Sequence, residues 1–373
     1  LKTYYPKEFI AASMTMDISN QNKLSEFYEE LKRINISTVR PDINKCYADF
    51  KTENDKFYYA LGGIKAVGSE AITNIVNERL KNGKFLSIND FVSRINPKDV
   101  NKLQLEGLVK AGAFDEMDLN RKKIIDSIPK IISTIKSKYD EKISNQSNLF
   151  DDNNKENENF EFETSEEWTS KELLAEEFKS LGFYISDHPL NEYKEFFTQL
   201  EIEPYKDFIN NNNKSEALVA GTIMSIQEKK SSKGTSFAII KFSDNHSEFE
   251  IFLFSDLLTL NREKLRESNS FVLTLQKEKT RIESAQRRVN IRKLVDLSDL
   301  VNKTYESVSI ELSDKKMLKE LNELLHKSGE TKINVLLKED SKNYKFELEH
   351  TRKFDFNLFS LIKNKEYVKK ISF

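Results

Sequence analysis

Residues 57–83 read FYYALGGIKAVGSEAITNIVNERLKNG, a strand-like run followed by a glycine-containing turn and then by a helix. The apolar residues of this helix recur at helical spacing and form one stripe: Ala71, Ile72, Ile75 and Val76. Gly83 ends the pattern, as glycine commonly does at the end of a helix. The turn Ile64–Ser69 is therefore expected to lie between two short helices.

This turn has the form of a helix-hairpin-helix, in which backbone N–H groups and the start of the second helix converge on an anion such as a phosphate. Such contacts hold the backbone of duplex DNA and do not read its bases. The predicted phosphate-binding residues are Lys65, Ala66, Gly68 and Ser69. An ordinary packing unit of two helices would explain the same pattern without a ligand.

A second helical pair follows, formed by Val100–Lys110 and a longer helix over about 119–143. Pro129 is expected to kink or interrupt the longer helix, because proline lacks a backbone N–H. The turn between the two helices is followed by Asp115 and Glu116, whose charges would repel a phosphate. We expect this second turn to be structural.

From Ala217 the apolar period changes to two. The five strand candidates are Leu218–Gln227, Phe237–Phe242, Glu248–Phe254, Phe271–Lys277 and Val289–Val295. A helical stretch, Asp256–Arg266, falls between the third and fourth. Three strands, a helix and two strands is the order of the OB-fold barrel, whose second and third strands face single-stranded nucleic acid. After Asn302, alternating strands and helices predict a small α+β domain, with Ser313 capping its first helix.

Charge and aromatic residues indicate where a single strand would bind this barrel. Residues 277–293 carry a net charge of +5, and cations beside aromatic strands are typical of a single-strand groove. The predicted single-strand-binding residues are Phe237, Lys241, Phe252, Lys279, Arg281, Arg287 and Arg288. Core packing is the competing explanation for each ring, because alternating apolar residues in short strands usually point inward.

The stretch 151–177 carries a net charge of −9, which predicts a solvated linker. Directly before it, residues 146–150 read QSNLF. A Gln, two spacers and an aliphatic–aromatic pair on a tether fit a short linear motif. In such a motif Gln146 sets the register, and Leu149 and Phe150 fill an apolar pocket of a partner.

Bulk composition excludes several classes of protein. The 373 residues carry a formal net charge of −2, so a nucleic-acid partner would have to bind local patches. One cysteine, Cys46, excludes a disulfide framework and a Cys-rich zinc site, and indicates a reducing cytoplasm. No stretch approaches the ~20 apolar residues of a membrane span, so no membrane partner is expected. No catalytic set or metal site is recognisable, and no cofactor is expected.

Six segments carry a resemblance to a known family: Phe9–Thr15 (FIAASMT), Arg40–Asn44 (RPDIN), Tyr59–Gly68 (YALGGIKAVG), Leu105–Asp115 (LEGLVKAGAFD), Gln146–Phe150 (QSNLF) and Leu181–Leu190 (LGFYISDHPL). In this order they resemble the C-terminal part of the bacterial DNA polymerase III alpha subunit, a replicative DNA polymerase. The resemblance implies that Gln146, Leu149 and Phe150 bind the sliding clamp, and that the C-terminal domain is used for the clamp loader's tau subunit. It also implies that the catalytic aspartates, with their Mg²⁺, lie in a palm domain upstream of Leu1, so that this fragment alone would be inactive.

The expected fold class is therefore multidomain α+β. The predicted parts are the end of the fingers region (1–56), a helix-hairpin-helix DNA-binding module (57–145), the clamp-binding motif and acidic linker (146–177), a helical connector (178–214), an OB-fold domain (215–302) and a C-terminal α+β domain (303–373).

The predicted function is that of the DNA- and clamp-engaging portion of a replicative polymerase in the bacterial cytoplasm. It would bind duplex and single-stranded DNA and support processive synthesis. Three alternatives stay open: a stand-alone single-strand-binding or accessory protein, the damage-tolerant alpha-subunit paralogue, and an OB-containing aminoacyl-tRNA synthetase fragment. The hairpin and the QSNLF segment argue against the last of these.

Overall fold

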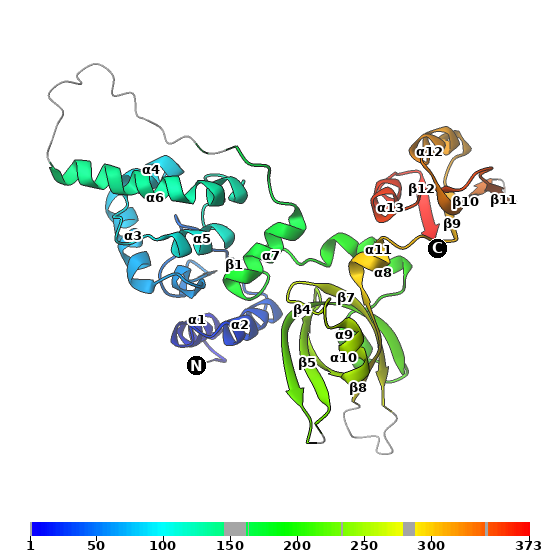
Figure 1. Ribbon diagram of the computed structural model, residues 1–373, viewed down its shortest axis with the longest axis horizontal. Coiled ribbons are helices and arrows are strands. Elements are labelled where there is room, and N and C mark those ends of the chain that lie inside the picture. The colour runs from blue at the N-terminus through cyan, green and yellow to red at the C-terminus, as the bar shows by residue number, and fades with distance from the viewer. Residues whose placement is uncertain (1, 145–161, 163, 233, 279–287, 340–341) are drawn as a thin grey trace. The chain divides into compact units, whose positions relative to one another are not determined.

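The structure is a computed structural model that describes residues 2–144, 162, 164–232, 234–278, 288–339 and 342–373. Contacts between Cα atoms divide the chain into two compact units, Leu1–His188 and Pro189–Phe373 (Figure 1). Each unit has its own buried apolar residues and is described by itself.

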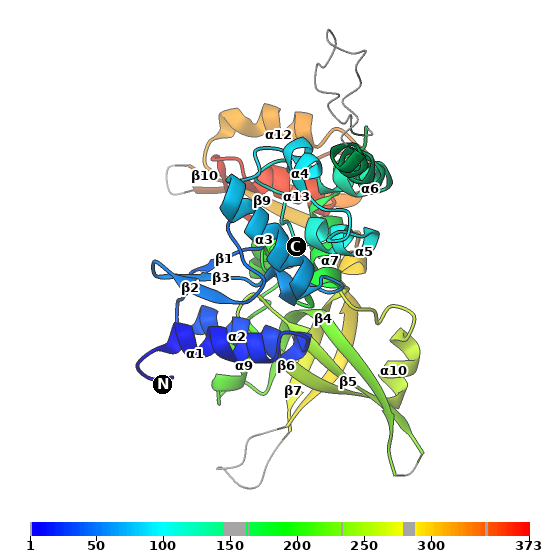
Figure 2. The same ribbon diagram turned by 90° about the vertical axis from the view of Figure 1, so that its left-hand side faces the viewer.

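The first unit begins with two helices that pack beside a small sheet (Figure 2). These elements are α1 (Pro6–Met16), α2 (Gln21–Arg33), β1 (Thr38–Val39), β2 (Lys51–Glu53) and β3 (Lys56–Tyr58). The central strand β3 runs parallel to β1 and antiparallel to β2. Asn20 caps α2, because its side chain accepts a hydrogen bond from the Lys23 backbone N–H (3.2 Å).

The rest of this unit is helical in the described residues. Its helices are α3 (Ser69–Asn82), α4 (Ile88–Arg94), α5 (Lys102–Lys110), α6 (Arg121–Ser144) and α7 (Ser170–Leu181). Phe91 of α4 packs edge-on against Phe85 and Phe114, with ring centroids 5.2 and 5.1 Å away. Of the two effects expected of Pro129, interruption is not found, because α6 continues through this residue. Ile128 beside it is fully buried, and such packing offsets the backbone hydrogen bond that a proline removes.

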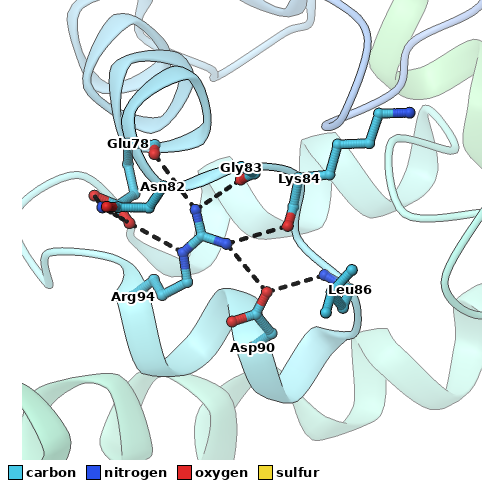
Figure 3. Close-up of a pocket in the computed structure, with 7 residues that line it drawn as sticks. All are labelled: Glu78, Asn82, Gly83, Lys84, Leu86, Asp90 and Arg94. Atoms are coloured by element: carbon cyan, nitrogen blue, oxygen red, sulfur yellow. Dashed lines mark hydrogen bonds and ion pairs between the residues drawn. The ribbon is translucent and has the colours of Figure 1, made fainter.

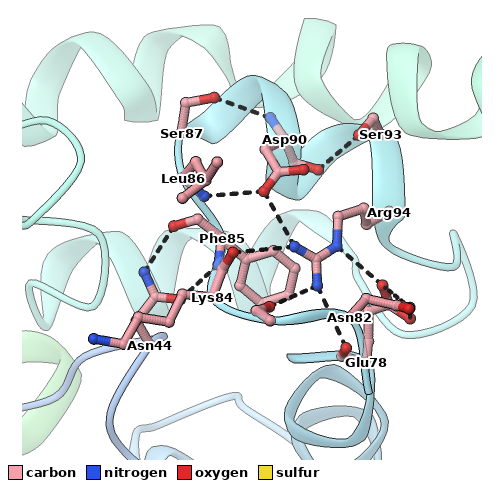
Figure 4. Close-up of polar contacts among 11 residues, drawn as sticks. Asn44, Glu78, Asn82, Lys84, Phe85, Leu86, Ser87, Asp90, Ser93 and Arg94 are labelled. Carbon is pink, nitrogen blue, oxygen red and sulfur yellow. Dashed lines mark hydrogen bonds and ion pairs between the residues drawn. The ribbon is translucent and has the colours of Figure 1, made fainter. Parts of the chain in front are cut away.

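Arg94 forms the junction between α3 and α4 (Figures 3 and 4). Its guanidinium donates to the Glu78 carboxylate (Nε–Oε1 3.0 Å), the Asp90 carboxylate (Nη1–Oδ2 3.1 Å) and the Gly83 carbonyl (Nη2–O 2.8 Å). It also lies over the Phe85 ring, 4.4 Å from the centroid. A cavity of about 610 Å³ opens beside these residues. Because the guanidinium is already engaged by the protein on every side, the junction is structural.

The second unit begins with short helices and continues as a five-stranded sheet. Its elements up to residue 301 are α8 (Lys194–Gln199), α9 (Tyr205–Asn210), β4 (Glu216–Lys230), β5 (Ser236–Ser243), β6 (Glu248–Phe254), α10 (Ser255–Asn261), β7 (Ser270–Lys277), β8 (Val289–Asp296) and α11 (Leu297–Val301). The order is β6-β5-β4-β7-β8, and every neighbouring pair is antiparallel. The five predicted strands and the helix between the third and fourth are therefore present.

The sheet encloses its own core but is not a closed barrel. Its inward side chains pack with Phe208 of α9 and Leu258 of α10. Some Cα atoms of the edge strands β6 and β8 approach within 8 Å of each other. No hydrogen-bonded ladder joins these strands in the described residues, so the predicted barrel closure is not found.

The strands and helices predicted for the small α+β domain are present at the end of the second unit. Its elements are β9 (Ser307–Leu312), α12 (Leu318–Leu324), β10 (Ser328–Glu339), β11 (Lys342–Glu347), α13 (Phe356–Lys363) and β12 (Val368–Ser372). The sheet order is β11-β10-β9-β12, with β9 and β10 parallel and the other two pairs antiparallel. Ser313 is not the predicted cap: Asp314 caps a 3-10 turn, Lys315–Met317, that leads into α12, and its carboxylate accepts from the Lys316 backbone N–H (2.8 Å).

Replacing Arg94 should destabilise the first unit locally. Arg94→Ala removes the charged donor from two partly buried carboxylates and from the Gly83 carbonyl just after α3, a loss of about 2–4 kcal/mol. Hydrogen exchange of the α3 and α4 amides measures this loss without assuming that both units unfold together. The control is Arg33→Ala, because that arginine is exposed and its ion pair with Glu30 (2.8 Å) lies at the surface. Equal exchange in the two variants would contradict the structural role of Arg94.

Candidate nucleic-acid interfaces

The first predicted turn follows a single 3-10 turn and not a full helix. That element is Leu61–Gly63, and it comes directly after the sheet. The Tyr59 and Leu61 backbone N–H groups donate to the Val39 (3.1 Å) and Tyr47 (2.8 Å) carbonyls. These bonds keep the chain extended up to Ala60, so the helix expected before the turn has only three residues in which to form.

The turn brings the four predicted phosphate-binding residues to one exposed place: Lys65, Ala66, Gly68 and Ser69. Ile64 and Val67 alternate with them and are buried, which anchors the turn to the core. Gly68 is the N-cap of α3 and has no side chain, so it leaves the first backbone N–H groups of this helix to other acceptors. The arrangement suits an anion, although Glu70 adds one negative charge to the first turn of α3.

The second turn, after α5, is held by the side chain of a nearby arginine, Arg121. Gly112 there adopts a left-handed backbone with φ 83°. The Arg121 guanidinium holds the Asp115 carboxylate through two bonds (Nε–Oδ1 2.8 Å, Nη2–Oδ2 2.6 Å) and donates to the Lys110 carbonyl (2.8 Å). The Arg121 side chain is only 6% exposed. The cation that could bind a phosphate is therefore used inside the protein, in keeping with a structural turn.

Negative charge also persists next to this second turn. Glu116 is hydrogen-bonded to Lys45, which lowers the pKa of the Glu116 carboxyl below its ordinary value. Lys45 contacts Asp42 as well (3.0 Å), and burial raises the pKa of Asp42. Lys45 is thus shared between two carboxyl groups, and we assign no phosphate contact to it.

The outer face of β5 and β6 carries a cluster of aromatic side chains near one end. In the strand register Phe237 lies opposite Phe254, and Ile239 lies opposite Phe252. Phe252 is 49% exposed and Phe254 is 59% exposed. The Phe237 and Phe252 rings lie 6.2 Å apart. The sequence prediction omits Phe254, although the period of two places it on the same face as Phe252.

The other end of the same face is charged. Lys241 lies opposite Glu250 in the register, and its Nζ lies 2.6 Å from Glu248 Oε2. The side chains of this ion pair are largely buried, at 15% and 12% exposed. Lys241, a predicted single-strand contact, is therefore neutralised by the protein, and the aromatic rings are the stronger feature of this face.

The basic stretch 277–293 is only partly described. Lys277 is 5% exposed, and its Nζ donates to the Phe208 (2.7 Å) and Asn211 (2.8 Å) carbonyls at the end of α9. It therefore does not belong to an exposed basic surface. Arg288 is exposed beside the start of β8. The remaining predicted residues lie outside the described ones: Lys279, Arg281 and Arg287 of the basic stretch, and Gln146, Leu149 and Phe150 of the linear motif.

Other kinds of site have little support in the described residues. No helix there is long and apolar enough to cross a membrane. Nor does that part of the chain hold a group of three or more His, Cys, Asp or Glu residues that could bind a metal ion. Cys46 donates its thiol hydrogen to the Arg40 carbonyl (3.1 Å), and burial raises the pKa of the Cys46 thiol to about 12. It is a buried structural thiol.

Comparisons with known proteins support a helix-hairpin-helix motif in the first unit. Residues 35–124 match a family described as the helix-hairpin-helix motif. Three relatives are named DNA polymerase III subunit alpha. The one from Borreliella burgdorferi is 30% identical over 93% of this chain and 31% of its own length. The one from Caulobacter vibrioides is 31% identical over 83% of this chain and 26% of its own length. The one from Campylobacter jejuni is 33% identical over 68% of this chain and 22% of its own length.

The chain spans less than a third of the length of these relatives. The match nevertheless runs through both units, since 93% of the chain aligns with the Borreliella protein. The chain belongs to the DNA polymerase III alpha-subunit family.

Proposed function

We propose that this chain is a DNA-engaging portion of a bacterial DNA polymerase III alpha subunit and acts in DNA replication in the cytoplasm. The observation that carries the proposal is the exposed turn 64–69, which lies within the stretch that matches the helix-hairpin-helix motif. The proposal treats the chain as part of a DNA-directed DNA polymerase and assigns it no cofactor of its own.

The turn would hold a phosphate of duplex DNA. The free N–H groups at the start of α3 and the helix dipole favour an anion there. The Lys65 ammonium would add a charge, and the Ser69 hydroxyl could donate a hydrogen bond. Contacts to the DNA backbone carry no sequence information, which suits a polymerase that must move along any template.

The aromatic face of β5 and β6 would hold single-stranded template. Base–aromatic stacking is tolerant of sequence and contributes about 1–3 kcal/mol per base. Phe237, Phe252 and Phe254 offer three rings close enough in the register to take successive bases. Arg288 would hold the phosphates of the same strand, together with Lys279, Arg281 and Arg287 of the basic stretch. This assigns an OB-like role to the sheet.

The linear motif QSNLF would bind the sliding clamp through Gln146, Leu149 and Phe150. A tether to a clamp that encircles DNA raises the local DNA concentration, so dissociation is followed by rebinding and synthesis becomes processive. The C-terminal α+β domain, 303–373, would be used for the clamp loader's tau subunit. These two partners rest on the sequence and its resemblance alone.

Lys65→Gln should weaken duplex binding by about threefold to tenfold and reduce the slope of log affinity against log salt by about one unit. Fluorescence anisotropy with a short duplex at several salt concentrations measures both quantities. Lys136→Gln is the matched control, because Lys136 is an exposed lysine on α6. Glu70→Gln should act in the opposite direction and strengthen binding, since it removes a repelling charge. An unchanged affinity for Lys65→Gln would rule out the phosphate contact.

The double variant Phe252→Ala with Phe254→Ala should weaken single-strand binding by about tenfold to a hundredfold, because two stacking rings are lost. Duplex affinity should stay the same. The matched control is Tyr344→Ala with Phe346→Ala, because these rings are also about half exposed, at 43% and 45%, on a strand of the other sheet. If both double variants bind an oligothymidine equally well, the aromatic face is not the single-strand site.

Leu149→Ala with Phe150→Ala should abolish binding of the chain to a purified bacterial sliding clamp and leave single-strand binding intact. The reason is that two apolar side chains would supply most of the buried contact area of so short a motif. Surface plasmon resonance with immobilised clamp measures the effect, and Asp151→Ala with Asp152→Ala is the neighbouring control. Unaltered clamp affinity would contradict the motif assignment.

A further inference from the structure

The backbone of the phosphate-binding turn 64–68 is strained and needs support from outside. Ala66 has φ 64°, the left-handed region, which costs an L-amino acid about 1–2 kcal/mol relative to its usual conformations. Inside the turn, one hydrogen bond joins the Val67 N–H to the Ile64 carbonyl (3.1 Å). This single bond offsets little of the conformational cost at Ala66. The conformation therefore depends on what the turn touches.

One support comes from the end of α7. The Lys65 backbone N–H donates to the Ser180 carbonyl (2.9 Å). Ser180 is in the last turn of α7, where carbonyls have no partner within the helix. The bond thus satisfies one group of the turn and one group of the helix end at once, and it fixes Lys65 directly.

A second support comes from Gln21, the first residue of α2. Its side-chain Nε2 donates to the Gly63 carbonyl (3.0 Å), just before the turn. The side chain also lies against the end of α7, because a Cβ built at Gly182 would approach Gln21 Cβ to 3.1 Å. Gly182 has φ 84°, a conformation that favours glycine, and an added Cβ would also crowd Gln21. Gln21 therefore contacts Gly63, just before the turn, and lies against Gly182, just after α7.

The third support is the surface of α5. A Cβ at Gly107 would lie 2.8 Å from the Lys65 carbonyl and 3.2 Å from Val67 Cγ2. The turn therefore packs directly against the backbone of α5 at Gly107, where there is no room for a side chain. Three helices that are distant in sequence meet around one five-residue turn.

The end of α7 is itself held firmly, so it can act as a support. The buried Glu177 carboxylate accepts from the Ile185 (2.9 Å) and Ser186 (3.0 Å) backbone N–H groups. The Phe183 ring packs 5.0 Å from Tyr28 of α2 and 6.1 Å from Tyr59. These contacts fix the chain on both sides of Gly182.

We infer that Gln21 is a positioning residue for duplex binding: together with the Ser180 carbonyl and Gly107 it forms a seat that holds the turn 64–68 in its phosphate-binding conformation. The inference rests on the proposed contact of this turn with DNA. Gln21 itself touches no phosphate in this view and acts through the Gly63 carbonyl and the end of α7.

The test uses Gln21→Met in the full chain, since methionine keeps the length of the side chain and removes the donor. Duplex affinity should fall about threefold to tenfold, and the Lys65 amide should exchange faster. Single-strand affinity and the circular dichroism spectrum should not change. Gln199→Met on α8 is the matched control and should bind duplex within twofold of the parent. Gly107→Ala, which adds one methyl against the Lys65 carbonyl, should reproduce the effect of Gln21→Met.

A double variant separates positioning from general stability. If Gln21 acts through the turn, Gln21→Met should cost less affinity in a Lys65→Gln background than in the parent, because part of the contact is already lost. Normal duplex affinity in both Gln21→Met and Gly107→Ala, alongside weakened binding by Lys65→Gln, would overturn the seat and leave the proposed function intact. If Lys65→Gln has no effect, the phosphate contact is wrong and the seat fails with it.

Discussion

The hydrogen bond from the Lys65 N–H to the Ser180 carbonyl is the contact around which the first unit is arranged. It pairs two backbone groups that local structure cannot satisfy, one in a strained turn and one at a helix end. Once α7 lies there, Lys110 of α5 reaches Glu176 (2.9 Å), and Arg121 of α6 approaches Glu177 (3.7 Å). Helices α5, α6 and α7 are therefore linked by charge on the side where the turn is seated.

The sequence predicted the elements with strong periodicity and missed those decided by distant contacts. The alternation in residues 218–295 identified all five strands, because inward and outward side chains leave a clear period of two. The full helix expected before Ile64 is absent because Tyr59 and Leu61 donate to the Val39 and Tyr47 carbonyls, a pairing that the local sequence does not reveal. The possible interruption of α6 at Pro129 was also not found, and buried neighbours such as Ile128 hold the helix there.

Counting charges along the sequence does not reveal which cationic side chains are exposed and which are buried. Arg79 carries a full charge in the sequence, yet its guanidinium is buried and donates to the Ile43 (2.6 Å) and Cys46 (2.8 Å) carbonyls. Burial also lowers the pKa of Arg79. Lys277 and Arg121 are likewise used inside the protein. The net charge of −2 thus combines structural cations with exposed ones, and only the exposed ones can meet a DNA phosphate.

The two proposed DNA surfaces would bind through different interactions: one through contacts to phosphate and the other through stacking on bases. The turn offers N–H groups, a lysine and a helix dipole, so its binding energy would come from phosphate. That binding would weaken as the salt concentration rises, because releasing counterions from DNA then gains less free energy. The face of β5 and β6 offers rings, while its lysine is neutralised by Glu248. Binding there would depend on exposed bases, which a duplex hides in its stack. A surface that needs unstacked bases selects single strands, and a surface that needs only backbone accepts duplex. On this proposal, one chain would hold duplex and single-stranded DNA at different surfaces without reading any sequence.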